Sequence, residues 1–511
     1  MAATFGLDFG TTNSLISVIR PNPDNQHQYG PDILTQGGRP HPSVVWYPGG
    51  DPVIGQTARD QLHELVLGVS GNIVRSPKMF LGHPIGIDVG GVKRQAVDIV
   101  ADILRYLRED ARKRKFEGNP FNTAVVTIPV TMLGPARADL RQAAMKAGIQ
   151  IHQFVHEPLA ALYGYLRSMS DFRQQFAYLD RRLVLVFDWG GGTLDLTLCQ
   201  FQDGVLMQIL NIGDKDVGGD AFDRRMYALV RRKHERQHPH VDWSKLQPTA
   251  QARLLLACED AKINLSSRQN TSIFVRDILA VPGAEKDLRL EVSKEELDGE
   301  VQDLITQGLC SIESLLNAAG VQRNTIEFCL ATGGMGSMPA IREGLVDLFG
   351  THRLRLIPNA ATVIAEGAAW IAHDKVGLKL AKPIEILHAD DSYVEIIPKG
   401  TNLPFAGKSI QHGMDMYCVD PSDGFAKFFF ARPQWPGRDS QGYKRIPYKH
   451  LTLPVDSQAQ PLLERLKVKV EINDDLIAEV SARSLMRQES RRAYIHDLEF
   501  GLSLSEAVQA E

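Results

Sequence analysis

The spacing of hydrophobic and polar positions divides the chain into two parts. Up to about residue 374, short apolar runs of strand length alternate with longer amphipathic stretches, which predicts an α/β fold. Helices are expected over 97–115, 135–148 and 293–320, from helical spacing of apolar residues or from a proline start and a glycine end. Buried strands are expected over 124–129 and 181–188, where the apolar residues are nearly continuous.

Beyond residue 383 the pattern is that of β-structure. Strands are expected over 393–398, 427–430 and 466–472, and the last of these alternates apolar and charged residues as a half-exposed strand does. The stretch between the two parts is short, mixed in character and ends in proline, so it is expected to be a linker. The predicted organisation is an α/β domain over 1–374, a linker over 375–383, a β domain over 384–501 and a tail over 502–511.

Composition narrows the class of protein. The chain has 511 residues, 43% of them hydrophobic and 23% charged, which is typical of a soluble globular protein with several domains. A net charge of −4 argues against a nucleic-acid partner, and the lack of an apolar stretch of spanning length argues against a membrane. The five cysteines form no CxxC pair and no signal peptide precedes the first strand, so a cytoplasmic location with reduced thiols is expected.

Two distant segments carry the same pattern, in which an apolar run and an aspartate lead into glycines and threonines. In the first segment the residues are Asp8, Gly10, Thr11, Thr12 and Asn13. In the second they are Asp188, Gly190, Gly191, Gly192, Thr193 and Asp195. A glycine turn after a strand exposes backbone N–H groups that can bind phosphate oxygens, and a neighbouring aspartate can hold a hydrated divalent cation. Two such turns predict two similar lobes that hold one nucleotide between them.

Phosphoryl transfer also requires a bound metal, a positive charge on the transferred group and a residue that orients water. Lys78 offers the positive charge and Glu157 offers a carboxylate. Glu157 has a structural interpretation as well, because a carboxylate at a helix start is stabilised by the helix dipole. The candidates for holding magnesium, through water, are Asp8, Asp188 and Asp195. A third glycine turn consists of Gly218, Gly219 and Asp220.

These pieces, in this order, resemble the seventy-kilodalton heat-shock chaperone family, within the actin and sugar-kinase superfamily. The string from Glu259 to Ser267 is specific to these chaperones and is lacking in actin and the sugar kinases. Further matching motifs lie at 128–129, 156–161, 331–339 and 366–369. Beyond residue 384 the chain resembles the family's peptide-binding β-sandwich more weakly, through 394–404 and 468–482.

The resemblance implies an actin-like two-lobed ATPase domain followed by a smaller β-sandwich domain. It implies ATP or ADP with Mg²⁺ as cofactors, and K⁺ as a further candidate cation. In the family pattern Thr11, Thr12 and the second glycine turn hold the β- and γ-phosphates. Lys78 and Glu157 place the attacking water, and Thr193 lies against the γ-phosphate.

The same resemblance assigns the nucleoside. Glu259 and Lys262 are implied at the ribose, and Ser266, Gly333 and Gly334 at the adenine. Ser337 stands where the family usually has an arginine that stacks on adenine. A cation–π contact is worth about 0.5–2 kcal/mol, so we expect weaker nucleotide binding by that order.

Other departures from the family pattern concern partners and coupling. Gln153 replaces an arginine that meets the J-domain partner, which argues against standard docking of such a partner. The stretch from Lys78 to Pro129 is shorter than usual, and the apolar run at 376–380 is interrupted by glycine and lysine. No helical lid is expected after the β domain.

Three functions are consistent with the sequence. The first is an ATP-driven chaperone without a lid, which binds unfolded peptide or a client protein by strand addition and uses a nucleotide-exchange factor. The second is a nucleotide-dependent scaffold for one dedicated partner. The third is a small-molecule kinase, for which no motif for a substrate carboxylate is found and which fold alone cannot establish.

Overall fold

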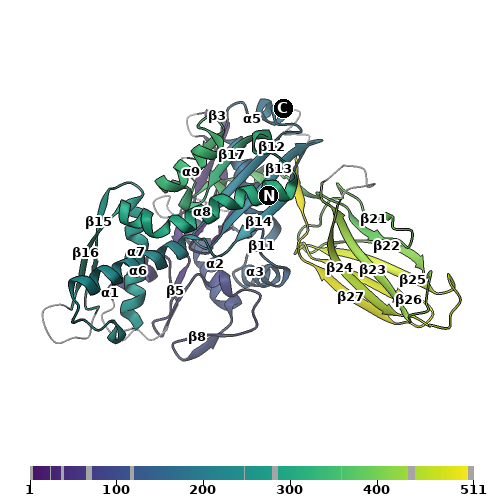
Figure 1. Ribbon diagram of the computed structural model, residues 1–511, viewed down its shortest axis with the longest axis horizontal. Helices are drawn as coiled ribbons and strands as arrows, with labels where there is room; N and C mark the ends of the chain where they lie inside the picture. The colour runs from purple at the N-terminus through teal and green to yellow at the C-terminus, as the bar shows by residue number, and fades with distance from the viewer. Residues whose placement is uncertain are drawn as a thin grey trace.

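The computed structural model describes residues 4–22, 25–35, 40–64, 72–114, 120–246, 248–278, 286–357, 360–435 and 444–504. Figure 1 shows a larger part, in which helices cover mixed sheets, and beside it an elongated part built of strands. The elongated part contains β20 to β27, and the chain ends back in the larger part with β28.

The first large sheet has the strand order β11-β10-β1-β2-β3, with β4 added to β2. Its strand β1 is an almost fully buried run, parallel to β10 and antiparallel to β2. Helices α4 and α10 pack on each other, and α10 also packs on β1. The bounds are β1 (Phe5–Phe9), β2 (Asn13–Asn22), β3 (Asn25–Ile33), β4 (His41–Pro42), β10 (Thr123–Ile128), β11 (Gln150–His156), α4 (Glu157–Arg167) and α10 (Val363–His373).

The second large sheet has the order β18-β17-β12-β13-β14-β28-β19. Strand β12 pairs antiparallel with β13 and parallel with β17, which repeats the pairing of β1 with β2 and β10. The repeated pairing supports the expectation of two similar lobes. The bounds are β12 (Leu183–Trp189), β13 (Leu194–Gln202), β14 (Val205–Asp214), β17 (Ile326–Thr332), β18 (Leu354–Leu356), β19 (Gly377–Leu380) and β28 (Phe500–Ser503).

The expected helices over 97–115, 135–148 and 293–320 are confirmed as α2 (Ala96–Lys113), α3 (Gly134–Lys146) and α8 (Lys294–Ala319). Helix α8 begins where it does because Ser293 and Glu296 form a capping box. It ends at Gly320, which adopts the left-handed conformation with φ of 67°. The other helices are α1 (Gln56–Glu64), α5 (Phe172–Tyr178), α6 (Gly219–Gln237), α7 (Pro248–Leu265) and α9 (Pro339–Phe349).

Small sheets extend both lobes. The first lobe carries β5 (Val44–Trp46), β6 (Val53–Ile54), β7 (Ile73–Arg75) and the hairpin of β8 (Ile87–Val89) and β9 (Val92–Arg94). The second lobe carries the hairpin of β15 (Asn270–Val275) and β16 (Leu288–Ser293). No helix in the described part of the chain is long and apolar enough to cross a membrane.

The elongated part consists of two four-stranded sheets, ordered β21-β20-β23-β24 and β22-β25-β26-β27. Strand β25 alternates buried apolar and exposed residues, which confirms the half-exposed strand expected at 466–472. The bounds are β20 (Ile384–Leu387), β21 (Tyr393–Ile397), β22 (Ser409–Tyr417), β23 (Phe425–Pro433), β24 (Arg445–Pro454), β25 (Arg465–Asn473), β26 (Ala478–Ser484) and β27 (Ser490–Ile495).

The structure differs from the sequence analysis at both ends of this part. Residues 377–380, expected in a linker, form β19, and residues 500–503, expected at the end of the β domain and the start of the tail, form β28. The two strands pair with each other, and β28 also pairs with β14. Short apolar segments of this kind become strands only through partners far away in the sequence. Residues 505–511 of the expected tail lie outside the described residues.

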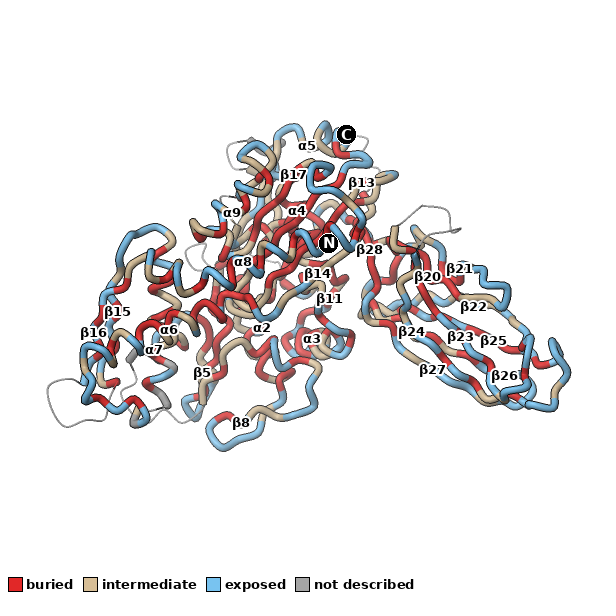
Figure 2. Tube along the Cα trace, in the orientation of Figure 1, coloured by how far each residue is buried: buried red, intermediate tan, exposed pale blue. Residues whose placement is uncertain are grey.

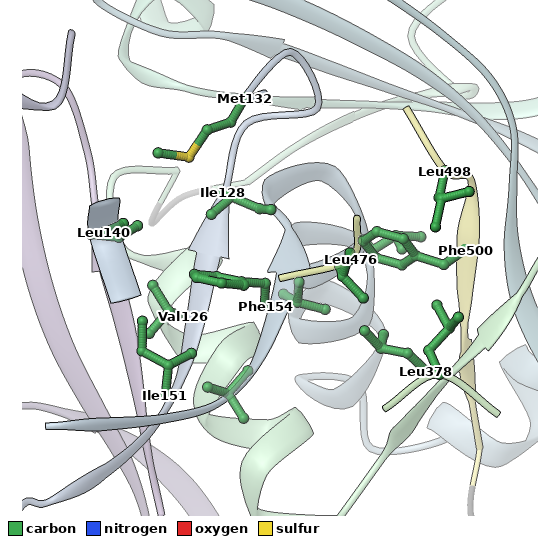
Figure 3. Packing of buried hydrophobic residues seen from close by; sticks show 14 of the residues in the cluster. Val126, Ile128, Met132, Leu140, Ile151, Phe154, Leu378, Leu476, Leu498 and Phe500 are labelled. Atoms are coloured by element: carbon green, nitrogen blue, oxygen red, sulfur yellow. The ribbon is translucent and has the colours of Figure 1, made fainter. Parts of the chain in front are cut away.

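One apolar cluster joins the two parts. Figure 3 shows side chains from β10 and β11, among them Val126 and Phe154, together with Leu378, Leu476 and Phe500. All five are at most 3% exposed, and they belong to one hydrophobic cluster. Figure 2 shows buried chain both at β28 and in the neighbouring strand β20. The contact between the parts is therefore built like a protein core.

Candidate active site

The two glycine turns have the same local structure. The Gly10 N–H donates to the Asn13 carbonyl at 3.0 Å, and the Gly190 N–H donates to the Thr193 carbonyl at 2.9 Å. Each turn closes an antiparallel hairpin, β1–β2 in one lobe and β12–β13 in the other. The sequence pattern that suggested two equivalent turns thus corresponds to two equivalent hairpins.

The two turns face each other across the lobes. A Cβ atom added at Gly191 would lie 2.5 Å from Thr12 Oγ1, and one added at Gly192 would lie 3.4 Å from Thr11 Cγ2. Thr12 is itself held by its carbonyl, which accepts from the Ser43 N–H at 2.7 Å. A side chain at position 191 would therefore displace the Thr12 hydroxyl, whereas the distance at position 192 is an ordinary contact.

The third glycine turn packs against the second. A Cβ atom at Gly218 would lie 2.2 Å from the Gly192 carbonyl carbon, which no side chain allows. The Gly219 N–H donates to the Gly190 carbonyl at 3.1 Å, and the Asp220 N–H donates to the Gly191 carbonyl at 2.7 Å. Because Gly219 opens α6, the start of this helix lies at the second glycine turn.

Buried carboxylates gather at the ends of these strands. Burial, followed by the charge of Glu157, raises the pKa of Asp8 to about 6 and the pKa of Asp195 to about 7. Burial also raises the pKa of Asp188 well above its usual range, with Glu157 and Asp195 as the next causes. Three threonines hold these carboxylates: Thr127 donates to Asp8 at 2.7 Å, Thr193 to Asp195 at 2.8 Å and Thr332 to Asp188 at 3.1 Å.

The carboxylate cluster fits a hydrated cation. Oδ1 of Asp195 is buried and makes no hydrogen bond to the described part of the protein. Among the described residues, no three His, Cys, Asp or Glu side chains are arranged to hold a metal directly. Negative charge in excess, with an unsatisfied oxygen and no direct ligand set, suits a divalent ion that keeps its water molecules.

Lys78 and Glu157 form a buried ion pair beside this cluster. Lys78 lies in a short 3₁₀-helix (Pro77–Phe80), and its Nζ donates to Glu157 Oε1 at 3.0 Å. The side chains are 5% and 14% exposed. Glu157 is also the first residue of α4, so both interpretations of this residue agree with its position.

The outer part of the cleft is bridged by charged side chains. Lys262 Nζ lies 2.8 Å from Asp223 Oδ1 and donates to the Gly219 carbonyl at 3.1 Å. Glu259, one helical turn earlier on α7, lies 3.7 Å from Arg59 and 3.4 Å from Arg75 of the first lobe. The pairs made by Glu259 connect the lobes directly, whereas Lys262 and Asp223 both belong to the second lobe.

The remaining expected site residues lie along the β17 turn and the end of α7. Gly333 has a φ of +80°, and a Cβ there would lie 2.4 Å from the Trp189 carbonyl oxygen and 2.6 Å from Asp188 Oδ1. Ser337 is exposed and donates to the Gly334 carbonyl at 2.7 Å. Ser266 Oγ donates to the Lys262 carbonyl at 3.4 Å, so its hydroxyl lies at the end of α7.

Some residues that hold the site's side chains in place were not predicted from the sequence. Thr127 and Thr332 orient Asp8 and Asp188, and Asp223 partners Lys262. Thr127 is the penultimate residue of β10, two residues before Pro129, and Thr332 ends β17 next to Gly333, which is a signal that the sequence does offer. Asp223 and Arg59 carry no such signal, because their partners are far away in the sequence.

The fold and the site define a two-lobed protein with a glycine turn in each lobe and a buried acidic cluster beside these turns. A family model described as Hsp70 protein matches residues 82–391. The chain belongs to the Hsp70 family.

Curated relatives agree with this assignment. The chain is 28% identical over 412 residues to a chaperone protein DnaK of Thermosipho melanesiensis, a match that covers 78% of this chain and 66% of that protein. It is 32% identical over 394 residues to a chaperone protein DnaK of Deinococcus radiodurans, covering 72% and 59%. The chain thus matches less than two thirds of the length of these relatives.

Proposed function

We propose that this protein is an ATP-dependent chaperone that hydrolyses ATP and couples its nucleotide state to the binding of an extended peptide or client protein. The observation that carries the proposal is the pair of facing glycine turns beside the buried carboxylates Asp8, Asp188 and Asp195. The relatives are chaperones by name, which favours this function over a scaffold for one partner.

The phosphates and the metal belong to the inner cleft in this proposal. Asp8, Asp188 and Asp195 hold Mg²⁺ through water, a role supported by their raised pKa values and by the unsatisfied Asp195 Oδ1. When bound, Mg²⁺ neutralises phosphate charge and polarises the γ-phosphate. The phosphate oxygens accept from backbone N–H groups of the turns, which are Gly10, Thr11, Thr12 and Asn13 in one lobe and Gly190, Gly191 and Gly192 in the other.

The attacking water is placed by Lys78 and Glu157. Their ion pair lies next to the carboxylates, so the Lys78 ammonium can approach a phosphate oxygen while Glu157 accepts a hydrogen bond from water. Thr193 donates to Asp195 in the second turn and lies where the γ-phosphate is expected. Hydrolysis then requires only positioned groups and no covalent intermediate on the protein.

The nucleoside occupies the outer cleft. Lys262 and Glu259 flank the ribose from α7, and Asp220 and Gly219 lie beside them at the start of α6. The adenine lies between Ser266 and the turn that begins at Gly333, Gly334 and Ser337. Without an arginine at position 337, the adenine lacks one stacking partner.

The domain division is also a proposal. The ATPase domain comprises residues 1–374, and the two four-stranded sheets form a β-sandwich over 384–495 that binds the client. Within the described residues no helix follows β27, so this β domain has no helical cover there. A nucleotide-exchange factor is a candidate partner.

Calorimetry and hydrolysis together test the function. Isothermal titration of ATP and ADP with Mg²⁺ should give saturable heats, and the protein should release phosphate slowly from ATP. The Asp195→Asn variant should bind Mg²⁺·ATP more weakly, because it removes one of the carboxylates. No heat at millimolar nucleotide would refute the proposal. Binding of one saturable protein partner, with no competition by generic unfolded peptides, would support the scaffold instead.

A further inference from the structure

The last described strand of the chain returns to the sheet of the ATPase domain. Strand β28 lies between β14 and β19, antiparallel to both. Met207 of β14 is opposite Gly501, and Lys379 of β19 is opposite the same glycine on the other side. The chain therefore leaves the ATPase domain through β19, builds the β domain and comes back through β28 alongside its own exit.

Backbone hydrogen bonds continue from this sheet into the β domain. The Leu380 N–H donates to the Thr401 carbonyl at 2.9 Å, and the Gly400 N–H donates to the Leu380 carbonyl at 2.8 Å. The Leu403 N–H donates to the Leu378 carbonyl at 2.9 Å. Strand β19 is thus paired on both edges, with β28 on one side and with residues 400–403 on the other. We call the unit of β28, β19 and residues 400–403 the clasp.

Buried charges fasten the clasp to the β-sandwich. Lys382, whose side chain is 0% exposed, lies 3.1 Å from Glu499 Oε1. Glu499 Oε2 lies 3.0 Å from Arg432 on β23, and Arg432 also lies 2.9 Å from Asp497. The entry segment, the return segment and the sandwich are joined by one charge-balanced cluster. Separating its buried members, Lys382, Glu499 and Arg432, is costly because each would be left buried and unpaired.

The β domain contacts both lobes on either side of the clasp. On the first lobe, Gln153 Nε2 donates to the Val376 carbonyl just before β19 at 2.8 Å, and Arg137 donates to the Leu476 carbonyl of the β domain at 3.2 Å. The His156 and Phe500 rings lie 4.1 Å apart, and Figure 3 shows Phe500 beside Leu476 and near Phe154. On the second lobe, Trp435 Nε1 donates to the Ala319 carbonyl at the end of α8 at 2.9 Å.

We propose that the clasp holds the β domain docked across both lobes of the ATPase domain whatever nucleotide is bound. The inference rests on the proposed function only in assuming that nucleotide states exist. When the lobes rotate, the continuous sheet moves the β domain together with the lobes. The β domain changes position but does not detach from the ATPase domain. The surface of the β domain that binds the client therefore belongs to a docked domain in every nucleotide state.

The position of Gly501 allows a sharp test of the clasp. A Cβ added at Gly501 would lie 2.6 Å from the Leu206 carbonyl oxygen and 3.1 Å from Met207 Cα, so Gly501→Ala forces β28 away from β14. Gly377 on β19 provides the matched control, because a Cβ there meets no atom within 4 Å and its φ is not in the left-handed region. Gly377→Ala adds the same methyl group to the neighbouring strand.

Distance between the parts can be measured in the full chain with two dyes. All five cysteines are described, and Cys310 on α8 is exposed while the other four are buried. Ser457→Cys adds a second exposed thiol in the turn between β24 and β25. Single-molecule energy transfer between the two dyes then reports how far the β domain lies from α8.

We expect one narrow population of constant transfer efficiency without nucleotide, with Mg²⁺·ADP and with Mg²⁺·ATP, and the same result for Gly377→Ala. Gly501→Ala should add a second, broader population in every condition. A second population in the unmodified protein with any nucleotide would overturn the proposal, as would a Gly501→Ala protein that stays fully docked. If Gly501→Ala does not fold, Glu499→Gln replaces it with the same expectations. A failure to bind ATP would refute the proposed function alone, since the nucleotide-free measurement still tests the clasp.

Discussion

The cleft between the lobes and the clasp both bury charged side chains, yet they differ in charge balance. In the cleft the carboxylates outnumber Lys78, and burial raises the pKa of Asp8 to about 6 and that of Asp195 to about 7. One oxygen of Asp195 makes no hydrogen bond to the described residues. The protein alone does not neutralise the buried carboxylates of such a site, and a bound ligand with positive charge does so.

The charged cluster at the clasp, in contrast, is balanced in charge without a ligand. Lys382 and Arg432 meet Glu499 and Asp497, so two positive and two negative groups balance. The backbone around them is paired in a continuous sheet. Both sites are polar clusters within a core, and the difference between them is their net buried charge. An excess of negative charge indicates a ligand site, whereas a balanced cluster indicates a structural contact between parts of the protein.

The largest expected effect concerns the balanced cluster. Glu499→Gln leaves Lys382 buried without its negative partner, so the free energy of unfolding should fall by about 3–5 kcal/mol. Asp497→Asn is the matched control, because Asp497 is 62% exposed and Arg432 keeps Glu499. That control should cost at most about 1 kcal/mol. Denaturant unfolding measures both values, and equal losses would contradict the distinction between the two carboxylates.

In the cleft, Lys78→Ala should lower kcat for ATP hydrolysis by about 10²–10³-fold, because it removes the positive charge beside the reacting phosphate. Nucleotide affinity should change far less, since the glycine turns remain. Lys467→Ala, at an exposed position on β25, serves as the control and should behave as the unmodified protein. A loss of affinity as large as the loss of kcat would show that Lys78 serves binding instead.

The surplus of negative charge predicts a pH dependence in the metal-free protein. Asp8 and Asp195 have folded pKa values of about 6 and about 7, above the ordinary value of 3.8. Between about pH 4 and pH 7 the folded state therefore holds protons that the unfolded state releases, and the free energy of unfolding falls as the pH rises. Thermal unfolding across this range should show the decline, and Mg²⁺·ADP should reduce it. A flat profile without metal would contradict the raised pKa values.

The smallest expected effect tests the adenine side of the cleft. Ser337→Arg should tighten ATP binding by about 0.5–2 kcal/mol, or roughly 2- to 30-fold, through stacking on the base. Calorimetric titration measures the change, and Ser337→Ala, which lacks the cation, should leave the affinity within about twofold. Unchanged affinity in the arginine variant would mean that position 337 does not face the adenine.

Prediction from the sequence succeeded where a local pattern repeats. The hairpins after Asp8 and Asp188 and the helices α2, α3 and α8 follow from apolar spacing and from glycine, serine and proline at the ends. Gln153 shows the limit of such reasoning. Its identity argued against one partner, but only the structure shows it bound to the Val376 carbonyl in the chain's own connecting segment.

The sequence alone determined the α/β and β halves of this chain, its glycine turns and its membership of a family, because these depend on spacing within short windows. Tertiary structure decided that residues 377–380 and 500–503 are neighbouring strands and that Lys382 is paired with Glu499. Each of those segments is too short and too mixed to specify a strand by itself. The two segments lie more than a hundred residues apart in the sequence, and only packing brings them together.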